Sequence, residues 1–226
     1  MKQVALTKPK VRVVSDSADT KCRILDAAER LFADRGIDAV SIRDITQAAK
    51  VNLAAVNYHF QNKKGMVAEV FGRRLQPINA RRLLLLTEAE MAAAPAAPGL
   101  PTVVEALVRP VVETGFEAHR RDEHFMRLMG RCIGESNDFT DELIFSYYEE
   151  MMRRFEAAFL RAVPALDGGE VFWRFKFTMG SLHHALLTCG MVDKIPGQAR
   201  KRLNSEHVIE RLVNFLSAGW MAPVTG

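Results

Sequence analysis

Apolar residues recur along this chain with the period of an α-helix. Between Thr20 and Gly36 they are spaced one, four, seven and eight residues from the first, at Ile24, Leu25, Ala28, Leu31 and Phe32. This spacing places the apolar side chains on one face of a helix, and glycine commonly follows the last residue of one. The pattern therefore predicts a first helix from about residue 20 to Gly36.

Two short helices and one long helix are predicted next. Ser41 opens the first short helix, and Asp44 stands three residues on, as in a capping box. Asn52 can cap the second short helix, which runs to about residue 60. Lys63 begins the long helix, in which Pro77 predicts a bend.

The segment AAAPAAPGLP, residues 92–101, is the clearest interruption of the helical period. Beyond it no stretch alternates as a strand would, and the period predicts further helices over about 102–119, 122–134, 138–163, 169–190 and 205–221. The sequence therefore predicts an all-α protein. Its expected parts are a disordered basic arm over 1–18, a helix-turn-helix domain over 19–75 (with the motif at about 41–60) and a helical domain over 76–226.

The second short helix carries side chains suited to DNA. In a helix-turn-helix unit this helix lies in the major groove, and small side chains at Ala54 and Ala55 let its backbone approach the bases. Asn57 can pair with an adenine edge, and Tyr58 and His59 are long enough to reach phosphate oxygens. The alternative is that Asn52 is only a helix cap and that Tyr58 and His59 are ordinary surface residues.

The charge of the chain is uneven. Residues 1–82 hold 16 Lys and Arg against 8 Asp and Glu, a net charge of +8, whereas the remainder holds 15 against 19, a net charge of −4. A basic first third favours contact with a polyanion. No run is apolar enough to span a membrane, and the start has no apolar signal segment, so we expect a cytoplasmic protein without membrane contact.

Residues 24–71 resemble the DNA-binding domain of the TetR family of bacterial transcriptional regulators. The motifs that carry the resemblance are Ala27, Ala28, Leu31 and Phe32 in the first helix, Gly36, Ser41, and Tyr58-His59-Phe60 followed by lysines. The resemblance implies a homodimeric, mostly repressing regulator that binds a double-stranded DNA operator. It also implies a variable helical C-terminal domain that binds a small effector.

The same resemblance assigns roles in DNA binding. It implies phosphate contacts from Ser41, Tyr58 and either Lys63 or Lys64. It implies positions at or near the bases for Arg43, Asn52, Ala54, Ala55, Asn57 and His59. Two residues depart from the family pattern: Lys50 stands where a glycine is usual in the turn, which costs roughly 1 kcal/mol in a left-handed conformation, and Asn57 stands where many members have tyrosine.

The last two predicted helices are expected to form the dimer interface. Both have broad apolar faces, and a four-helix bundle made from two copies of the pair would cover them. The interface is predicted to include Trp173, Leu187, Val208, Leu212, Phe215 and Leu216. The alternative is that both helices fill the core of a monomer.

A Met- and Phe-rich interior is predicted to bind an apolar effector. The candidate residues are Phe125, Met126, Met129, Met152, Phe155, Phe175, Met179 and His183. The segments FMRLMGRCIGES and FWRFKFTMGS are similar to the PsrA-type branch of the family, which implies a long-chain fatty acid or its CoA ester. Arg127, Arg131, Arg174 and Lys176 are then candidates for its anionic group. Plain core packing, or a different hydrophobic effector such as a drug or an aromatic compound, is the alternative.

Other classes of function find little support in the sequence. An enzyme would need a positioned nucleophile, an acid/base pair or a cofactor motif, and the sequence has no GxSxG, phosphate-binding glycine loop or HExxH. A helical interaction module would leave the basic first third unexplained. His183 and His184 are adjacent on a helix and point about 100° apart, so we expect no metal site and no cofactor.

Overall fold

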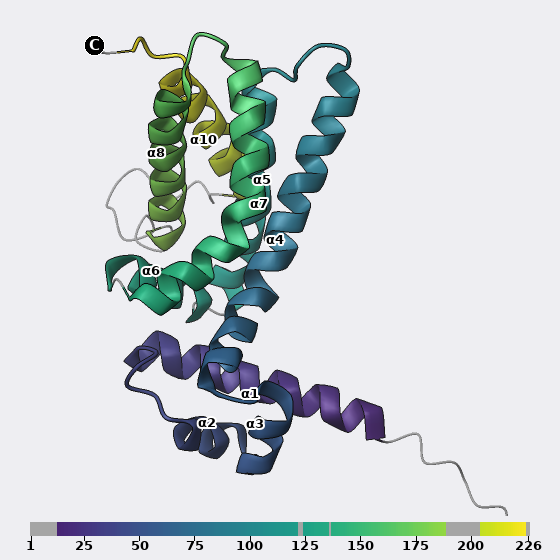
Figure 1. The fold of residues 1–226 in the computed structure, drawn as a ribbon, viewed down its shortest axis with the longest axis vertical. Helices are drawn as coiled ribbons and strands as arrows, with labels where there is room; N and C mark the ends of the chain where they lie inside the picture. The colour runs from purple at the N-terminus through teal and green to yellow at the C-terminus, as the bar shows by residue number, and fades with distance from the viewer. Residues whose placement is uncertain (1–12, 122–123, 136, 189–203, 225–226) are drawn as a thin grey trace, which may run out of the picture. The chain divides into compact units, whose positions relative to one another are not determined.

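The computed structural model describes residues 13–121, 124–135, 137–188 and 204–224, and every regular element in these ranges is an α-helix (Figure 1). This confirms the predicted all-α class. The helices are α1 (Val13–Arg35), α2 (Ile42–Ala49), α3 (Leu53–Phe60), α4 (Lys63–Ala93), α5 (Leu100–Arg121), α6 (His124–Gly134), α7 (Asp138–Ala162), α8 (Gly168–Leu187) and α10 (Ser205–Trp220). The chain divides into two compact units, Met1–Val70 and Phe71–Gly226.

The N-terminal unit is built around the apolar faces of its short helices. The buried side chains come from α1, α2, α3 and the start of α4, and they include Ile24, Phe32, Ile45, Val56, Phe60 and Met66. Each of these residues lies on the face that the helical period predicts. The unit is therefore a small bundle in which α2 and α3 pack on α1 and on each other.

The first helix begins earlier than the sequence pattern predicts. It starts at Val13, so the expected arm is wrong for residues 13–18, while residues 1–12 of that arm lie outside the described residues. No proline or glycine follows Pro9 before Gly36, so nothing in the backbone stops the helix from extending back from Thr20. At its other end, Gly36 has a φ of 86° and closes α1, as predicted.

The C-terminal unit packs its helices around an aromatic cluster. The ring of Phe159 on α7 stacks on Trp220 of α10, with ring centroids 3.8 Å apart and planes 8° apart. Phe155 and Phe175 meet the same Phe159 ring at 6.3 and 6.2 Å. The indole nitrogen of Trp220 donates to the hydroxyl of Thr178 at 2.9 Å, which satisfies the polar group of this buried side chain.

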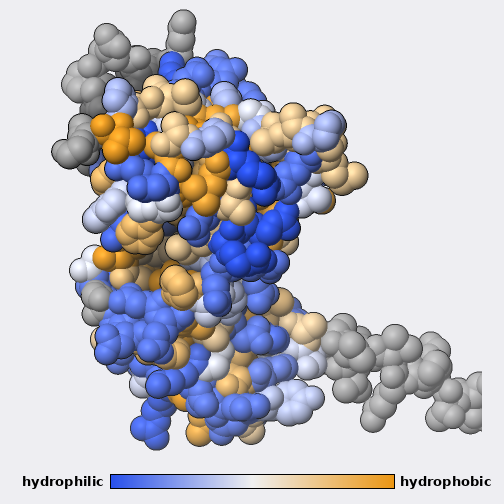
Figure 2. Space-filling view, turned by 45° about the horizontal axis from the view of Figure 1, so that its top comes forward, coloured by the Kyte–Doolittle hydropathy of each residue, from blue (hydrophilic) through white to orange (hydrophobic). Residues whose placement is uncertain are grey.

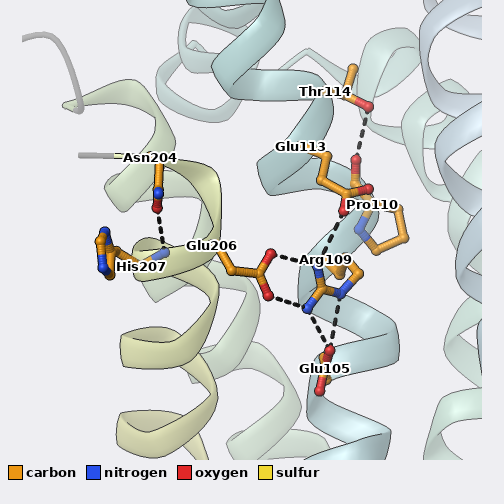
Figure 3. Close-up of polar contacts among 8 residues, drawn as sticks. All are labelled: Glu105, Arg109, Pro110, Glu113, Thr114, Asn204, Glu206 and His207. Carbon is orange, nitrogen blue, oxygen red and sulfur yellow. Dashed lines mark hydrogen bonds and ion pairs between the residues drawn. The ribbon is translucent and has the colours of Figure 1, made fainter. Parts of the chain in front are cut away.

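Polar contacts fasten α10 to α5 (Figure 3). The guanidinium of Arg109 on α5 donates from Nη1 and Nη2 to the two carboxylate oxygens of Glu206, each at 2.8 Å. The same guanidinium donates to Glu105 and Glu113, one turn away on each side. Asn204 caps α10 by accepting from the backbone N–H of His207. The first turn of α10 is therefore held both by its own cap and by α5.

Helix α7 and helix α8 form an antiparallel pair. They are joined by residues 163–167, and Asp167 caps α8 by accepting from the backbone N–H of Glu170 at 2.8 Å. Because the two helices run in opposite directions, residues late in α7 face residues early in α8, as the contact between Phe159 and Phe175 shows. Within the described ranges, no helix is long and apolar enough to cross a membrane, and no group of three metal-ligating side chains gathers.

Candidate DNA-binding surface

Helix α3 has one buried face and one exposed face. Val56 and Phe60 are 1% and 4% exposed and anchor the helix in the N-terminal unit. Ala54, Asn57 and Tyr58 lie on the exposed face at helical spacing, and Tyr58 is 80% exposed. Helix α3 therefore presents these three predicted contact residues on one exposed face, while its opposite face is packed in the core of the unit.

The remaining predicted residues lie around this face. Arg43, Asn52 and Lys64 are exposed, whereas Ala55, His59 and Lys63 are half-buried. The ring of His59 meets Tyr58 edge-on at 5.0 Å and Phe60 at 5.8 Å, so it lies between the exposed and buried faces. Lys63 donates from Nζ to the backbone carbonyl of Asp38 at 3.3 Å. Its charge is thereby held beside the loop that leads into α2.

Exposed Leu53 also belongs to this surface, although it was not among the predicted contact residues. It is the first residue of α3 and is 55% exposed, directly between Asn52 and Ala54. The helical period from Ala54 and Asn57 places Leu53 on the same face, and this was the signal available in the sequence. An exposed leucine there can make apolar contact with thymine methyl groups.

The helix caps set the start of α2 and α3. The Ser41 hydroxyl accepts from the backbone N–H of Asp44, and the Asp44 carboxylate accepts from the backbone N–H of Ser41 at 2.8 Å, which confirms the predicted capping box. The Ser41 hydroxyl also donates to this carboxylate at 2.5 Å. Together with weaker contributions from Arg35, these bonds lower the pKa of Asp44 to about 2. Asn52 accepts from the backbone N–H of Ala55 and so acts as the predicted cap of α3.

The turn between α2 and α3 passes through a left-handed residue. Lys50 has φ 54° and ψ 48°, the conformation that glycine adopts without cost. Arg23 of α1 stabilises this turn by donating from Nη2 to the carbonyls of Ala49 and Lys50, at 2.7 and 3.1 Å. These carbonyls are among those that a helix end leaves unpaired. Arg23, which the sequence pattern did not single out, therefore positions the turn.

The junction of α3 and α4 requires a glycine. A Cβ atom added to Gly65 would lie 2.5 Å from the carbonyl oxygen of Phe60. This contact is with backbone, so it cannot be relieved by a side-chain rotation. Gly65 therefore allows the first turn of α4, with Lys63 and Lys64, to start close to the end of α3.

The predicted effector-binding residues are divided among two parts of the C-terminal unit. Phe155 and Phe175 belong to the aromatic cluster, whereas Phe125 meets Phe71 at 6.2 Å. Phe125 and Met129 are buried, and the half-buried members are Met126, Met152, Met179 and His183. Burial lowers the pKa of His183 to about 4, with a smaller contribution from the charge of Arg82.

The charged candidates for an effector's anionic group already have protein partners. Arg131 pairs with Glu135 at 2.9 Å, and Arg127 lies 2.8 Å from the Nδ1 atom of His124. Buried Arg174 pairs with Glu170 at 3.0 Å and donates to the carbonyls of Gly219 and Trp220. Lys176 lies over the rings of Phe172 and Trp173. The sequence pattern did not single out Arg82, which is 0% exposed.

An exposed apolar face lies on α8 and α10. Trp173, Leu187 and Phe215 of the predicted dimer interface are 52%, 40% and 69% exposed, and Val208 is half-buried. Leu212 and Leu216 are instead buried within the protomer, because they lie on the face of α10 that packs on α5. Phe172 and Phe177 of α8 are exposed beside Trp173. Figure 2 shows apolar side chains gathered among hydrophilic ones in the part of the view that holds the C-terminal unit.

Two family matches divide the chain in the same way as the fold. Residues 24–70 match the family described as bacterial regulatory proteins, tetR family. Residues 105–219 match the tetracyclin repressor-like C-terminal domain. The first match covers α2 and α3, and the second covers most of the C-terminal unit.

Individual relatives give shorter or more distant matches. The HTH-type transcriptional regulator AcrR of Shigella flexneri is 30% identical over 129 residues, which are 57% of this chain and 54% of AcrR. The chain thus spans no more than about half the length of the curated relatives that it matches.

Two solved structures share the fold. The fatty acid degradation regulator FadR of Bacillus halodurans has 14% identity and a TM-score of 0.64, covering 96% of this chain and all of that chain. FadR of Bacillus subtilis in complex with stearoyl-CoA has 15% identity and a TM-score of 0.61, covering 88% and 98%.

Proposed function

Because the chain belongs to the TetR family of bacterial regulators, we propose that it represses transcription as a homodimer that binds a palindromic operator and leaves it when a small apolar effector binds. The exposed face of α3 is the observation that carries the DNA-binding part of this proposal. It presents small and hydrogen-bonding side chains from a helix that is capped at its start and anchored in the core.

The roles of individual residues follow from their positions. Ala54 and Ala55 allow close approach to the bases, and Asn57 reads a base edge. Tyr58 and Lys64 bind phosphates, and Ser41 does so in exchange for its bond to Asp44. The side-chain oxygen of Asn52 accepts from the backbone N–H of Ala55, which leaves its amide N–H groups to donate to DNA.

The dimer is formed by α8 and α10 in this proposal. Phe172, Trp173 and Phe177 make a contiguous exposed aromatic surface on α8, and Phe215 adds an exposed ring on α10. Such surfaces are typical of protein interfaces. The proposed interface therefore includes exposed Phe172 and Phe177 and no longer includes Leu212 and Leu216, which are buried within the protomer. Two DNA-binding units of a dimer would then read half-sites about 34 Å apart, or a wider spacing.

A long-chain fatty acid or its CoA ester is the proposed effector class. Support comes from the Met and Phe side chains of α6, α7 and α8 and from the fold shared with FadR of Bacillus subtilis, which was solved with stearoyl-CoA. The second candidate is a different hydrophobic compound, such as a drug or an aromatic molecule. Family membership also places the chain among regulators rather than enzymes.

Fluorescence anisotropy with a labelled duplex tests this function directly. The duplex is taken from upstream of the protein's own gene and is titrated against excess unrelated DNA, with and without oleoyl-CoA. Specific binding that oleoyl-CoA releases supports both the regulator and its effector class. Specific binding that oleoyl-CoA does not release keeps the regulator and removes the CoA ester from the proposed effector class. If that duplex is not bound, selection from random sequences decides, and failure to select any site contradicts the DNA-binding proposal.

A further inference from the structure

Arg82 is a fully buried arginine without an acidic partner among the described residues. It lies on α4 within the C-terminal unit and is 0% exposed. Its Nε donates to the carbonyl of Leu107 at 2.8 Å, and its Nη1 donates to the side-chain oxygen of Asn79 at 3.1 Å. Among the described residues, its Nη2 has no hydrogen-bond partner. Within the described ranges, these acceptors of the guanidinium are therefore neutral groups, and one of its terminal nitrogens lacks an acceptor.

Burial without a counter-charge is unfavourable for a guanidinium. Burial lowers the pKa of Arg82 below the ordinary value for arginine, although arginine remains charged in proteins. Tyr148 partly offsets the effect of burial on this pKa, but neither Tyr148 nor His183 supplies a full negative charge at neutral pH. Burial raises the pKa of Tyr148, so its phenol is neutral, and His183 is neutral because its pKa is about 4. Buried charges in proteins are usually paired, and this one lacks a pair within the described part of the chain.

Arg174 shows how the same unit treats an arginine with a structural role. It is also buried, but Nε pairs with Glu170 at 3.0 Å, and Nη1 donates to the carbonyls of Gly219 and Trp220 at the end of α10. Its charge is matched by a carboxylate of the protein, and its donors close a helix end. Arg82 has no such carboxylate among the described residues, and a ligand could supply one.

The residues around Arg82 continue into an apolar row. Tyr148 on α7 and His183 on α8 lie near its guanidinium. One turn further along α7 lies Met152, and one turn back along α8 lies Met179, both half-buried. Because α7 and α8 are antiparallel, these two methionines lie on the same side of the polar group, toward the aromatic cluster. Methionine side chains are flexible and rearrange readily around an apolar chain.

We propose that Arg82 is the anion-binding residue of the effector site, where it binds the carboxylate of an amphipathic organic acid whose apolar part lies between α7 and α8 along Met152 and Met179. This inference rests on the proposed effector-binding function and specifies its chemistry. A carboxylate accepts two parallel N–H bonds from the guanidinium fork and neutralises its charge. Tyr148, as a phenol, and His183, as a neutral imidazole, can each donate to the carboxylate.

The free acid is favoured over its CoA ester by the same reasoning. A thioester carbonyl is uncharged, so an acyl-CoA whose acyl chain lies along the apolar row would leave the charge of Arg82 without a counter-ion. A fatty alcohol would do the same. The ligand that suits this group therefore combines an apolar chain with a terminal carboxylate.

Isothermal titration calorimetry on the full-length protein tests the proposal. The probes are oleate, oleyl alcohol and oleoyl-CoA, each below its critical micelle concentration, and octanoate and 2-naphthoate serve as acids of other shapes. The parent protein is expected to bind at least one of the acids, and to bind oleate at least about tenfold more tightly than oleyl alcohol if oleate is that acid. Arg82→Met keeps an unbranched apolar stem that reaches to about the position of Nε, removes the charged group, and should remove this preference.

A matched control separates the site from general charge effects. Arg81→Met removes the same charge from the neighbouring exposed position of α4 and should bind the acids as the parent does. If Arg82→Met does not fold, as judged from its thermal melt, Tyr148→Phe takes its place. That variant should weaken acid binding by about threefold to tenfold with no effect on alcohol binding.

Several outcomes would overturn the proposal. These are failure of the parent to bind any of the three acids, equal affinity for oleate and oleyl alcohol when oleate binds, and unchanged acid binding by Arg82→Met. Tighter binding of oleoyl-CoA than of oleate, with no loss in Arg82→Met, would favour the ester instead. Operator binding by the same proteins is measured in parallel. If the parent binds no operator, the proposed regulatory function is contradicted. If the parent binds its operator but none of the acids, only the proposed role of Arg82 is contradicted.

Discussion

Arg109 and Glu206 stand 97 residues apart in the sequence and form a bidentate ion pair that joins α5 to the first turn of α10. The N···O distance is 2.8 Å in both bonds. The guanidinium of Arg109 also donates to the carboxylates of Glu105 and Glu113. The bonds to Arg109 lower the pKa of Glu206, so the pair is present at neutral pH and is lost as the pH falls below the ordinary range of a carboxyl group.

Removing this pair should loosen the attachment of α10. Glu206→Gln is expected to lower the melting temperature at pH 7, and the difference from the parent should shrink as the pH falls and Glu206 becomes protonated. Glu210→Gln, a change at an exposed position on the same helix, is the control and should leave the melting temperature unchanged. Equal melting temperatures for parent and Glu206→Gln at pH 7 would show that the pair is fully screened by solvent.

The left-handed turn at Lys50 should be improved by glycine. Lys50→Gly is expected to stabilise the N-terminal unit by about 1 kcal/mol, because glycine adopts φ 54° without steric cost. Gln47→Gly, within α2, should instead destabilise it by about 1 kcal/mol. Urea unfolding followed by circular dichroism measures both free energies. A loss of stability in Lys50→Gly would mean that the greater freedom of glycine in the unfolded chain outweighs the relief of strain.

Asn57 and Tyr58 should differ in how they affect DNA binding. Asn57→Ala is expected to change which bases are preferred, whereas Tyr58→Phe should weaken binding to all sequences alike. Selection from random duplexes followed by anisotropy at about 150 mM salt measures both effects. If Tyr58→Phe binds as tightly as the parent, its hydroxyl does not contact phosphate. An unchanged preference in Asn57→Ala would leave base reading to other residues of α3.

A charge in the exposed aromatic surface of α8 should separate the dimer. Phe177 is 65% exposed, so Phe177→Glu is expected to yield a folded monomer in analytical ultracentrifugation, with weaker operator binding. Phe145→Glu places the same charge at an exposed phenylalanine of α7 and should leave the oligomeric state unchanged. A Phe177→Glu protein that sediments like the parent dimer would exclude this face as the interface.

His183 should make the C-terminal unit less stable in acid. Its folded pKa of about 4 lies below the ordinary value of 6.5, because burial and the charge of Arg82 disfavour the imidazolium. Its contribution to stability is therefore full above pH 6.5 and is lost as the pH falls toward 4. Between pH 7.5 and pH 5 the loss should be about 2 kcal/mol. Comparing the urea unfolding of the parent with that of His183→Gln at both pH values isolates this share, because other groups titrate in both proteins.

Features set by local chemistry could be predicted from the sequence. The capping box joins Ser41 and Asp44, which are three residues apart. The positive φ at Gly36 is the conformation of a single residue. The apolar faces of α1, α2 and α3 follow from the helical period alone. Such local features are enough to predict the all-α class and the face of α3 that packs in the core.

Features set by distant contacts could not be predicted in the same way. Leu212 and Phe215 are three residues apart on α10, and only the packing on α5 shows that the first is buried and the second exposed. Arg82 falls on the same face of α4 as Leu75, Ile78 and Leu86, which was a signal of burial in the sequence. That it lacks an acid, whereas Arg174 has one, depends on which helices surround each residue.

The two tryptophans of the chain occupy opposite environments, and this gives the protein two built-in optical reporters. Trp220 is 1% exposed and stacks on Phe159, whereas Trp173 is 52% exposed on the aromatic surface of α8. Emission from Trp220 should therefore shift to longer wavelength only when the C-terminal unit unfolds. Emission from Trp173, and its quenching by iodide, should respond when that surface is covered by a second protomer. Single-tryptophan variants, Trp173→Phe and Trp220→Phe, would thus follow assembly and unfolding separately without any attached label.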